Sequence, residues 1–183
     1  MKLERLLLVG GNTRHIGKTT LICELIRKFS PLYPVTGLKV TSIYQNDALH
    51  HGSHDLLAGK DFEIAQEQAK TKGKDTAKML ACGAGQAFYV QARDHAVEKA
   101  WKALLQHLPE NTLLICESRT LRRFIQPGVF IYLKSSRIET EKPLSAFLEK
   151  SADLVITDPN PQDLASLAER IEVQYAACFK LFK

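Results

Sequence analysis

Residues 3–20 read LERLLLVGGNTRHIGKTT, and the arrangement expected for the rest of the chain depends on them. Leu6 to Val9 form a short apolar run, which is typical of a buried parallel strand. Gly10 and Gly11 follow, and we expect them to break that strand. The segment LICELIRKF, which begins at Leu21, has its apolar residues at helical spacing. A strand, a glycine-bearing loop and a helix in this order are typical of a phosphate-binding P-loop.

The residues of this loop have the chemistry that a triphosphate requires. Lys18 stands at the expected start of the helix, from which it would reach the β- and γ-phosphates, and the Thr19 hydroxyl would bind Mg²⁺. Backbone N–H groups and the positive end of the helix dipole would hold phosphate oxygens. We therefore predict a nucleotide-binding site made of consecutive residues: Gly11, Asn12, Thr13, Arg14, His15, Ile16, Gly17, Lys18, Thr19 and Thr20.

One position departs from the pattern G-x-x-x-x-G-K-[ST], because Asn12 stands where its first glycine belongs. Asparagine is among the few residues that tolerate a positive φ, so we expect Asn12 to adopt a positive-φ or turn-like conformation beside the phosphates. Arg14 and His15 are expected to be exposed and to face the γ-phosphate or a partner. The alternative is an ordinary strand-to-helix connection that happens to contain Gly-Lys-Thr.

A length of 183 residues suits one domain, and we expect a single P-loop NTPase domain over residues 1–183. Apolar residues make up 45% and charged residues 25%, which is typical of a globular protein. The net charge of +5 fits an anionic ligand such as a nucleotide, or an acidic partner. No block of Lys and Arg with interleaved aromatic residues occurs, so we do not expect nucleic-acid binding.

The N-terminal apolar run continues directly into the expected P-loop, so it is not read as a signal peptide. No apolar run has the length of a membrane span. The cysteines are scattered without a C-x-x-C pair, as expected for small buried side chains in a cytoplasmic protein: Cys23, Cys82, Cys116 and Cys178.

The rest of the sequence alternates between strand and helix patterns. Strands are expected at 35–41, 86–90, 111–116, 129–133 and 153–157, and helices at 74–82, 94–108, 121–124, 141–150 and 162–171. Residues 42–73 are polar and read as a long loop, with a short helical turn within 61–71. Continuous apolar strands that alternate with helices predict an α/β fold: a three-layer P-loop NTPase fold with a mainly parallel, doubly wound sheet.

Glu117 is the second candidate catalytic residue, together with Lys18. It follows the apolar run NTLLIC, at the carboxyl end of an expected buried strand, where open α/β sheets bind their ligands. A carboxylate there can hold Mg²⁺ or orient a water molecule, which is the role of a Walker B acid. The alternative is an acidic residue that complements the dipole of the helix that follows it.

The loop after the second strand carries several side chains that could bind a metal: Asp47, His50, His51, His54 and Asp55. The spacing H-H-x-x-H matches no closed zinc pattern, so metal binding by the histidines stays open. We expect this loop to be solvated or to meet the phosphates, with Asp47 as a further Mg²⁺ ligand.

Several other charged residues could contribute to the site or have only a structural role. Lys39 ends the second strand near the expected P-loop, so it either contacts phosphate or an acidic substrate, or is merely solvated. Asp75 could cap the helix that starts beside it. Asp158 follows a late strand, where it could accept hydrogen bonds from a guanine edge. Three arginines after Glu117 form either a solvated face or a site for an acidic partner: Arg119, Arg122 and Arg123.

With these residues together, the chain resembles the molybdopterin-guanine dinucleotide biosynthesis protein B family of P-loop NTPases. The resemblance lies in GGNTRHIGKTTL, in Lys39 followed by HHGSHD, in residues 73–76 with the later ACGAG, and in ICES. The chain departs from that family at Asn12 and at Ser118, where the family commonly has glycine after the acid. The resemblance implies a weak GTPase that assists delivery of a nucleotide or cofactor, often as a dimer.

The expected function is therefore that of a nucleotide-binding protein with weak, Mg²⁺-dependent hydrolysis of GTP or ATP. One alternative is a small-molecule kinase, in which Lys39, Lys74 and the arginines would hold an acidic acceptor. Another is a nucleotide-gated adaptor without significant turnover. The expected partners are a nucleotide, a partner protein or acidic small molecule, and a second copy of the chain.

Overall fold

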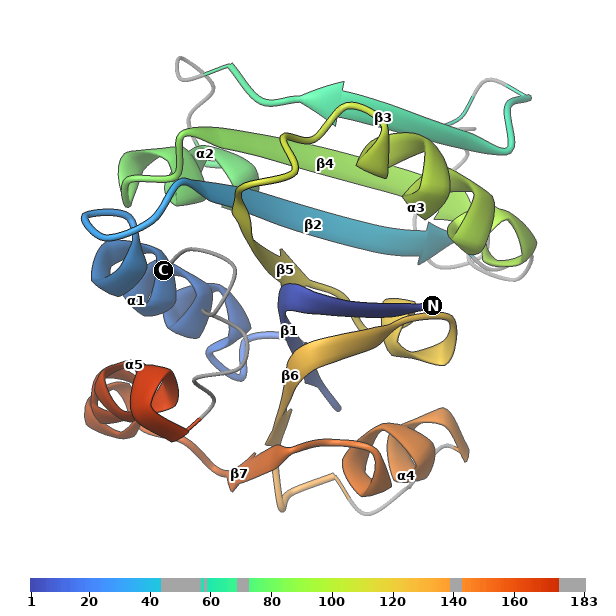
Figure 1. The fold of residues 1–183 in the computed structure, drawn as a ribbon. Helices are drawn as coiled ribbons and strands as arrows, with labels where there is room; N and C mark the ends of the chain where they lie inside the picture. Colours follow the sequence, from blue (N-terminus) through green and yellow to red (C-terminus); the bar gives the residue numbers. More distant parts are fainter. Residues whose placement is uncertain (44–56, 58, 69–72, 139–142, 175–183) are drawn as a thin grey trace.

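The computed structural model describes residues 1–43, 57, 59–68, 73–138 and 143–174. Among these residues, seven strands form one sheet in the order β3-β4-β2-β5-β1-β6-β7 (Figure 1). The strands are β1 (Lys2–Gly11), β2 (Val35–Ile43), β3 (Phe62–Gln66), β4 (Gln86–Arg93), β5 (Leu113–Glu117), β6 (Gln126–Lys134) and β7 (Leu154–Thr157). All neighbouring strands are parallel except β3, which runs antiparallel to β4.

Helices cover both faces of the sheet, so the chain has the expected three-layer α/β architecture with a mainly parallel sheet. The helices are α1 (Lys18–Phe29), α2 (Asp75–Ala81), α3 (Val97–Leu105), α4 (Pro143–Lys150) and α5 (Pro161–Gln174). Two short 3₁₀ turns, η2 (Asp94–Ala96) and η3 (Leu121–Arg123), follow β4 and β5. Side chains of α1, α2 and α5 belong to one core cluster, and side chains of α3, η3 and α4 belong to the other.

The central strand β1 contributes to both cores. Leu7 and Val9 belong to the cluster under α1, whereas Leu6 and Leu8 belong to the cluster under α3, and all four are fully buried. Successive side chains of a strand point to opposite faces, so a strand covered on both sides is apolar throughout. This explains the continuous run LLLV.

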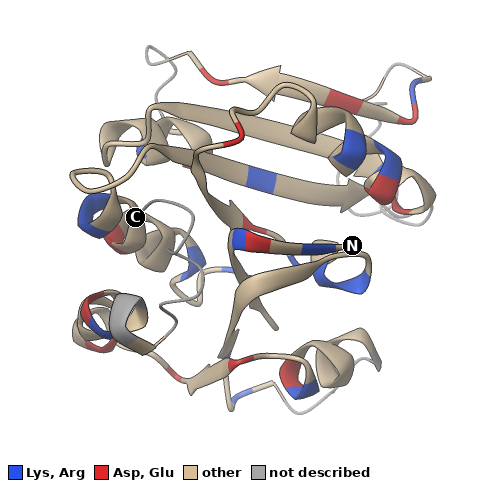
Figure 2. Ribbon diagram, in the orientation of Figure 1, with Lys and Arg blue, Asp and Glu red and all other residues tan. Residues whose placement is uncertain are grey.

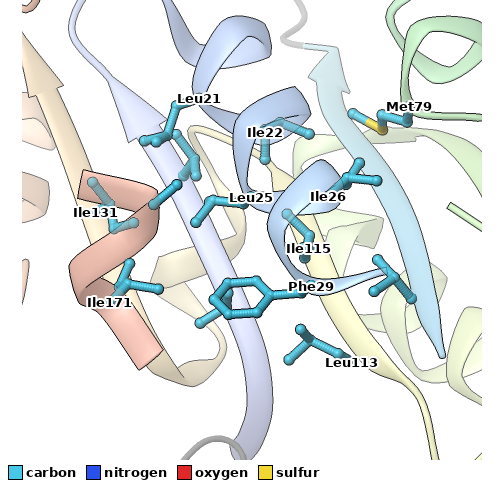
Figure 3. Close-up of a cluster of buried hydrophobic side chains, with 14 of the residues drawn as sticks. Leu21, Ile22, Leu25, Ile26, Phe29, Met79, Leu113, Ile115, Ile131 and Ile171 are labelled. Carbon is cyan, nitrogen blue, oxygen red and sulfur yellow. The ribbon is translucent and has the colours of Figure 1, made fainter. Parts of the chain in front are cut away.

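Helix α1 is fixed to the sheet by one apolar face (Figure 3). Its fully buried side chains are Leu21, Ile22, Leu25, Ile26 and Phe29. Each such side chain contributes about 1.5–3 kcal/mol relative to an exposed one. The N-terminus of α1 is consequently held at the carboxyl edge of β1, where the predicted site lies.

Two expectations about strands are wrong. Gly10 and Gly11 do not break β1, because they pair with Tyr132 and Leu133 of β6. Residues 62–66, within the expected helical turn at 61–71, form strand β3 instead. Its pairing with β4, such as Ile64 with Val90, supplies the hydrogen bonds that hold the segment extended.

Charged residues of both signs occur along α1, α3 and α4, while the central strands are mostly uncharged (Figure 2). Among the described residues, every helix is too short or too polar to span a membrane.

Candidate functional site

The candidate site lies at the carboxyl edge of the sheet, between β1 and β5. The chain leaves β1 through α1 toward β2, on one side, and leaves β5 through η3 toward β6, on the other side of β1. Open α/β sheets bind ligands where the order of strands changes direction in this way. Val9 pairs with Glu117, so the loop after β1 and the acid at the end of β5 are neighbours.

The loop 12–17 presents the start of α1 to this edge. Gly17 is the N-cap residue, with a left-handed φ of 96°, and His15 has a φ of 60°. The N–H of Leu21 donates to the Gly17 carbonyl oxygen at 2.9 Å. The three preceding N–H groups lack a partner within the helix by its geometry, and together with the helix dipole they suit an anion.

Lys18 bends back over this loop. Its Nζ donates to the carbonyl oxygen of Thr13 at 2.7 Å. A Cβ atom on Gly11 would lie 2.9 Å from the Leu133 carbonyl oxygen, so the glycine allows the close approach of β1 and β6 just before the loop. Burial lowers the pKa of Lys18 from 10.5, with Glu117 acting in the opposite direction. The ammonium group therefore lies in a partly desolvated position, beside the acid.

Asn12 has a different role from the one expected. The positive-φ conformation is absent there, since His15 and Asp158 are the non-glycine residues with positive φ in the described part of the chain. Asn12 forms a bend after β1, as the turn-like alternative requires. Its amide Nδ2 donates to the Ser135 carbonyl oxygen and its Oδ1 accepts from the Ser135 N–H, both at 3.0 Å. The side chain thus continues the pairing between β1 and β6 beyond the end of β1.

Thr19 and Glu117 are joined directly. The hydroxyl of Thr19 donates to Glu117 Oε2 at 3.0 Å, and only 8% of Glu117 is exposed. The other oxygen, Oε1, lies 4.0 Å from Lys39 Nζ. Two of the three residues expected to bind Mg²⁺ are therefore brought together, from α1 and β5.

Lys39 and Asp75 form an ion pair next to Glu117. Burial opposes the charge of each partner, but their hydrogen bond and mutual attraction outweigh it. The pKa of Lys39 is raised above 10.5 and that of Asp75 is lowered below 3.8. Asp75 also accepts from Lys78 Nζ at 3.2 Å. Lys39 is consequently part of the site rather than solvated, and Asp75 acts as its counter-ion.

The remaining expected residues divide into two groups. Arg14, His15 and Thr20 are exposed, and Thr13 and Ile16 are half-buried. Asp47, His50, His51, His54 and Asp55 lie outside the described residues.

The three arginines after Glu117 have different partners. Arg123 forms an ion pair with Asp94 at 2.7 Å, and Arg122 donates to the Ile125 carbonyl oxygen at 3.4 Å. Arg119 donates to Ser145 Oγ at 3.3 Å. Of these arginines, Arg119 is the one whose charge lowers the pKa of Lys18.

Asp158 has both carboxylate oxygens engaged by Ser136. Oδ1 accepts from the Ser136 N–H at 3.1 Å, and Oδ2 accepts from the Ser136 hydroxyl. These bonds lower the pKa of Asp158 below 3.8. The carboxylate therefore joins the segment after β7 to the segment after β6.

The donor set at Thr19 and Glu117 fits a hard cation. No group of three or more His, Cys, Asp or Glu side chains suited to a metal occurs in the part of the chain that the structure describes. Mg²⁺ does not need such a group, because it is usually bound by one or two protein oxygens together with substrate phosphates and water. A hydroxyl and a carboxylate oxygen 3.0 Å apart meet that requirement.

The fold and this edge define a three-layer α/β protein with a basic loop and a buried acid at the point where the strand order reverses. Comparison of the chain with models of protein families, with curated proteins and with solved structures finds no match.

Proposed function

We propose that this chain is a P-loop protein that binds a nucleoside triphosphate with Mg²⁺ at residues 11–20 and hydrolyses it slowly. The observation that carries the proposal is the 3.0 Å hydrogen bond between the Thr19 hydroxyl and Glu117 Oε2. An ordinary strand-to-helix connection has no need to place an acid from a second strand against the residue that follows its lysine.

The residues have separate roles in this proposal. The N–H groups at the start of α1 and the ammonium of Lys18 bind phosphate oxygens, after Lys18 exchanges the Thr13 carbonyl oxygen for phosphate. Thr19 and Glu117, whose oxygens lie 3.0 Å apart, would hold the metal. When bound, Mg²⁺ neutralises the negative charge that develops on the transferred phosphoryl group. Glu117 also orients the attacking water through its carboxylate.

The resemblance to the molybdopterin-guanine dinucleotide biosynthesis protein B family makes GTP the first nucleotide to test, and delivery of a nucleotide or cofactor the first biological role. A second candidate function is a small-molecule kinase. It is favoured by the position of Lys39, whose Nζ lies 4.0 Å from Glu117 Oε1 and would have to exchange its partner Asp75 for the acceptor. Such a lysine can bind an acidic acceptor next to the reacting phosphate, with Asp75 then released to other donors.

The test is ligand binding followed by product analysis. GTP, ATP and their non-hydrolysable analogues are added with and without Mg²⁺ to the native chain and to the Lys18→Ala variant, and the melting temperature is recorded. A ligand at 100 times its Kd adds about 2.7 kcal/mol to the stability of the folded state. We expect a Mg²⁺-dependent rise for the native chain that the variant loses. No rise for either chain with any nucleotide would overturn the proposal.

The products then separate the alternatives. Free phosphate indicates an NTPase, a phosphorylated acceptor indicates a kinase, and binding without either product indicates an adaptor.

A further inference from the structure

Arg119 is held in a fixed position directly beside the site. Ser118 precedes it and donates its N–H to the Val9 carbonyl oxygen at 3.0 Å, which ties this point of the chain to β1. The Ser118 hydroxyl oxygen accepts the N–H groups of Thr120 and Leu121, both at 3.2 Å. The backbone on either side of Arg119 is therefore determined by hydrogen bonds.

The guanidinium of Arg119 has few partners for its donors. Within the described part of the chain no carboxylate lies at ion-pair distance, and the hydrogen bond that it makes runs from Nη2 to Ser145 Oγ at 3.3 Å. Its Nε is buried and has no hydrogen-bond partner in the described part of the chain. By contrast, Arg123 and Arg27 reach Asp94 and Glu24 at 2.7 Å. Because a buried donor without a partner costs free energy, this arrangement favours an added acceptor.

Two further donors lie beside Arg119. Ser145 belongs to α4 and is 8% exposed, and the hydroxyl of the buried Tyr132 has no partner among the described residues. Burial raises the pKa of Tyr132, and nearby Ser145 and Arg119 act in the opposite direction. The one carboxylate in α4, Glu149, is bound through both oxygens by Lys134 at 2.9 Å. Its negative charge is therefore matched, and among the described residues no carboxylate lies close enough to pair with Arg119.

We propose that Arg119, Ser145 and Tyr132 form a second anion subsite, adjacent to the phosphate loop, that binds a phosphate or carboxylate group. A planar guanidinium binds such an oxyanion through two parallel hydrogen bonds, and the two hydroxyls supply further donors. This inference rests on the proposed function, because that function supplies the nucleotide that would bind beside the subsite. Its occupant is either the terminal phosphate of that nucleotide or the anionic group of a second substrate.

The test compares the native chain with Arg119→Gln and Arg119→Lys. Arg27→Gln is the matched control, because it removes the same charge from an arginine at the surface of α1 that is already paired. Binding of a non-hydrolysable triphosphate, of the diphosphate and of inorganic phosphate is measured by calorimetry. Circular dichroism and the melting temperature verify that each variant is folded.

The two sources of the anion give different results. If the terminal phosphate occupies the subsite, Arg119→Gln weakens triphosphate binding by about 10-fold or more and leaves diphosphate binding unchanged. If a second substrate occupies it, both nucleotides bind as before, and the variant loses binding of inorganic phosphate to the diphosphate-saturated chain. In both cases Arg119→Lys restores only part of the affinity, because lysine keeps the positive charge but lacks the two parallel N–H donors of the guanidinium group.

Failure of this inference is distinguishable from failure of the proposed function. If Arg119→Gln binds all three ligands as the native chain does, the subsite is wrong while nucleotide binding stands. If no nucleotide binds but inorganic phosphate does, and Arg119→Gln alone removes it, the subsite stands and the nucleotide function is wrong. If the native chain binds neither nucleotide nor phosphate, both are overturned.

Discussion

Thr19 and Glu117 are 98 positions apart in the chain, and the hydroxyl of the first donates to the carboxylate of the second at 3.0 Å. The pairing of β1 with β5 produces this contact, because it sets Val9 level with Glu117. The contact gives each partner a measurable role.

Replacement of Glu117 by Gln separates catalysis from binding. The amide keeps the shape and can still accept from Thr19, but it lacks the charge that stabilises a transition state. We expect nucleotide affinity to fall by less than about 10-fold and turnover by about 100-fold or more. Turnover is measured as phosphate release at saturating nucleotide. Glu98→Gln, which breaks an exposed ion pair with Lys102 within α3, is the control. Unchanged turnover would show that Glu117 only stabilises the fold.

Replacement of Lys18 by Ala removes the ammonium that faces the loop. We expect nucleotide affinity to fall by about 100-fold, because a charge-assisted contact to phosphate is lost from a partly desolvated site. The melting temperature should change little, since the lysine loses one hydrogen bond, to Thr13. Lys102→Ala, at an exposed ion pair with Glu98, is the matched control. Equal affinities in the native chain and the Lys18 variant would exclude the P-loop assignment.

Replacement of Asn12 tests what this side chain does. Asn12→Gly restores the glycine of the usual motif, yet we expect it to destabilise the protein by about 1–3 kcal/mol, as does Asn12→Ala. Both variants lose the two hydrogen bonds to the half-buried Ser135, whose N–H and carbonyl groups lose these partners. Chemical denaturation measures the change. A Gly variant as stable as the native chain would mean that the bonds to Ser135 contribute nothing.

The ion pair of Lys39 and Asp75 makes stability depend on pH at both extremes. Because the pKa of Asp75 is below 3.8 in the folded chain, its contribution is present above that value and is lost as pH falls through the folded pKa. Because the pKa of Lys39 is above 10.5 in the folded chain, its contribution is present below that value and is lost as pH rises through the folded pKa.

Chemical denaturation of the native chain and of Asp75→Asn at a series of pH values measures how much the charge of Asp75 contributes to the free energy of unfolding. The variant should be less stable near neutral pH, by on the order of 1 kcal/mol, and the difference should shrink below about pH 4. A difference that stays constant down to the lowest pH would show that the charge of Asp75 is irrelevant.

Most of the framework could be predicted from local patterns. The run LLLV and the helical spacing after Gly17 placed β1 and α1, since both signals arise from burial of the residues themselves. Strand β3 was missed for a physical reason. It is an edge strand whose side chains are at most half-buried, so its apolar signal is weak, and its hydrogen bonds come from β4.

The site could be predicted only in part. Lys18, Thr19 and Glu117 follow from motif spacing and from the end of a buried strand, and the structure brings them together. The bond between Asn12 and Ser135, and the proposed subsite around Arg119, depend on residues more than ten positions apart in the chain. A single sequence contains no periodic signal for such contacts.

The central position of β1 also has a consequence for synthesis of the chain on the ribosome. β1 is made before both of its neighbours, β5 and β6, so Leu6 and Leu8 have no strand partners until Leu114 and Phe130 are made. At 5–20 residues per second, the wait is roughly ten seconds. During that time the run LLLV has no strand beside it. An exposed apolar segment of this kind can be bound by a chaperone. A strand that is made early is thus enclosed only when much later strands have been made.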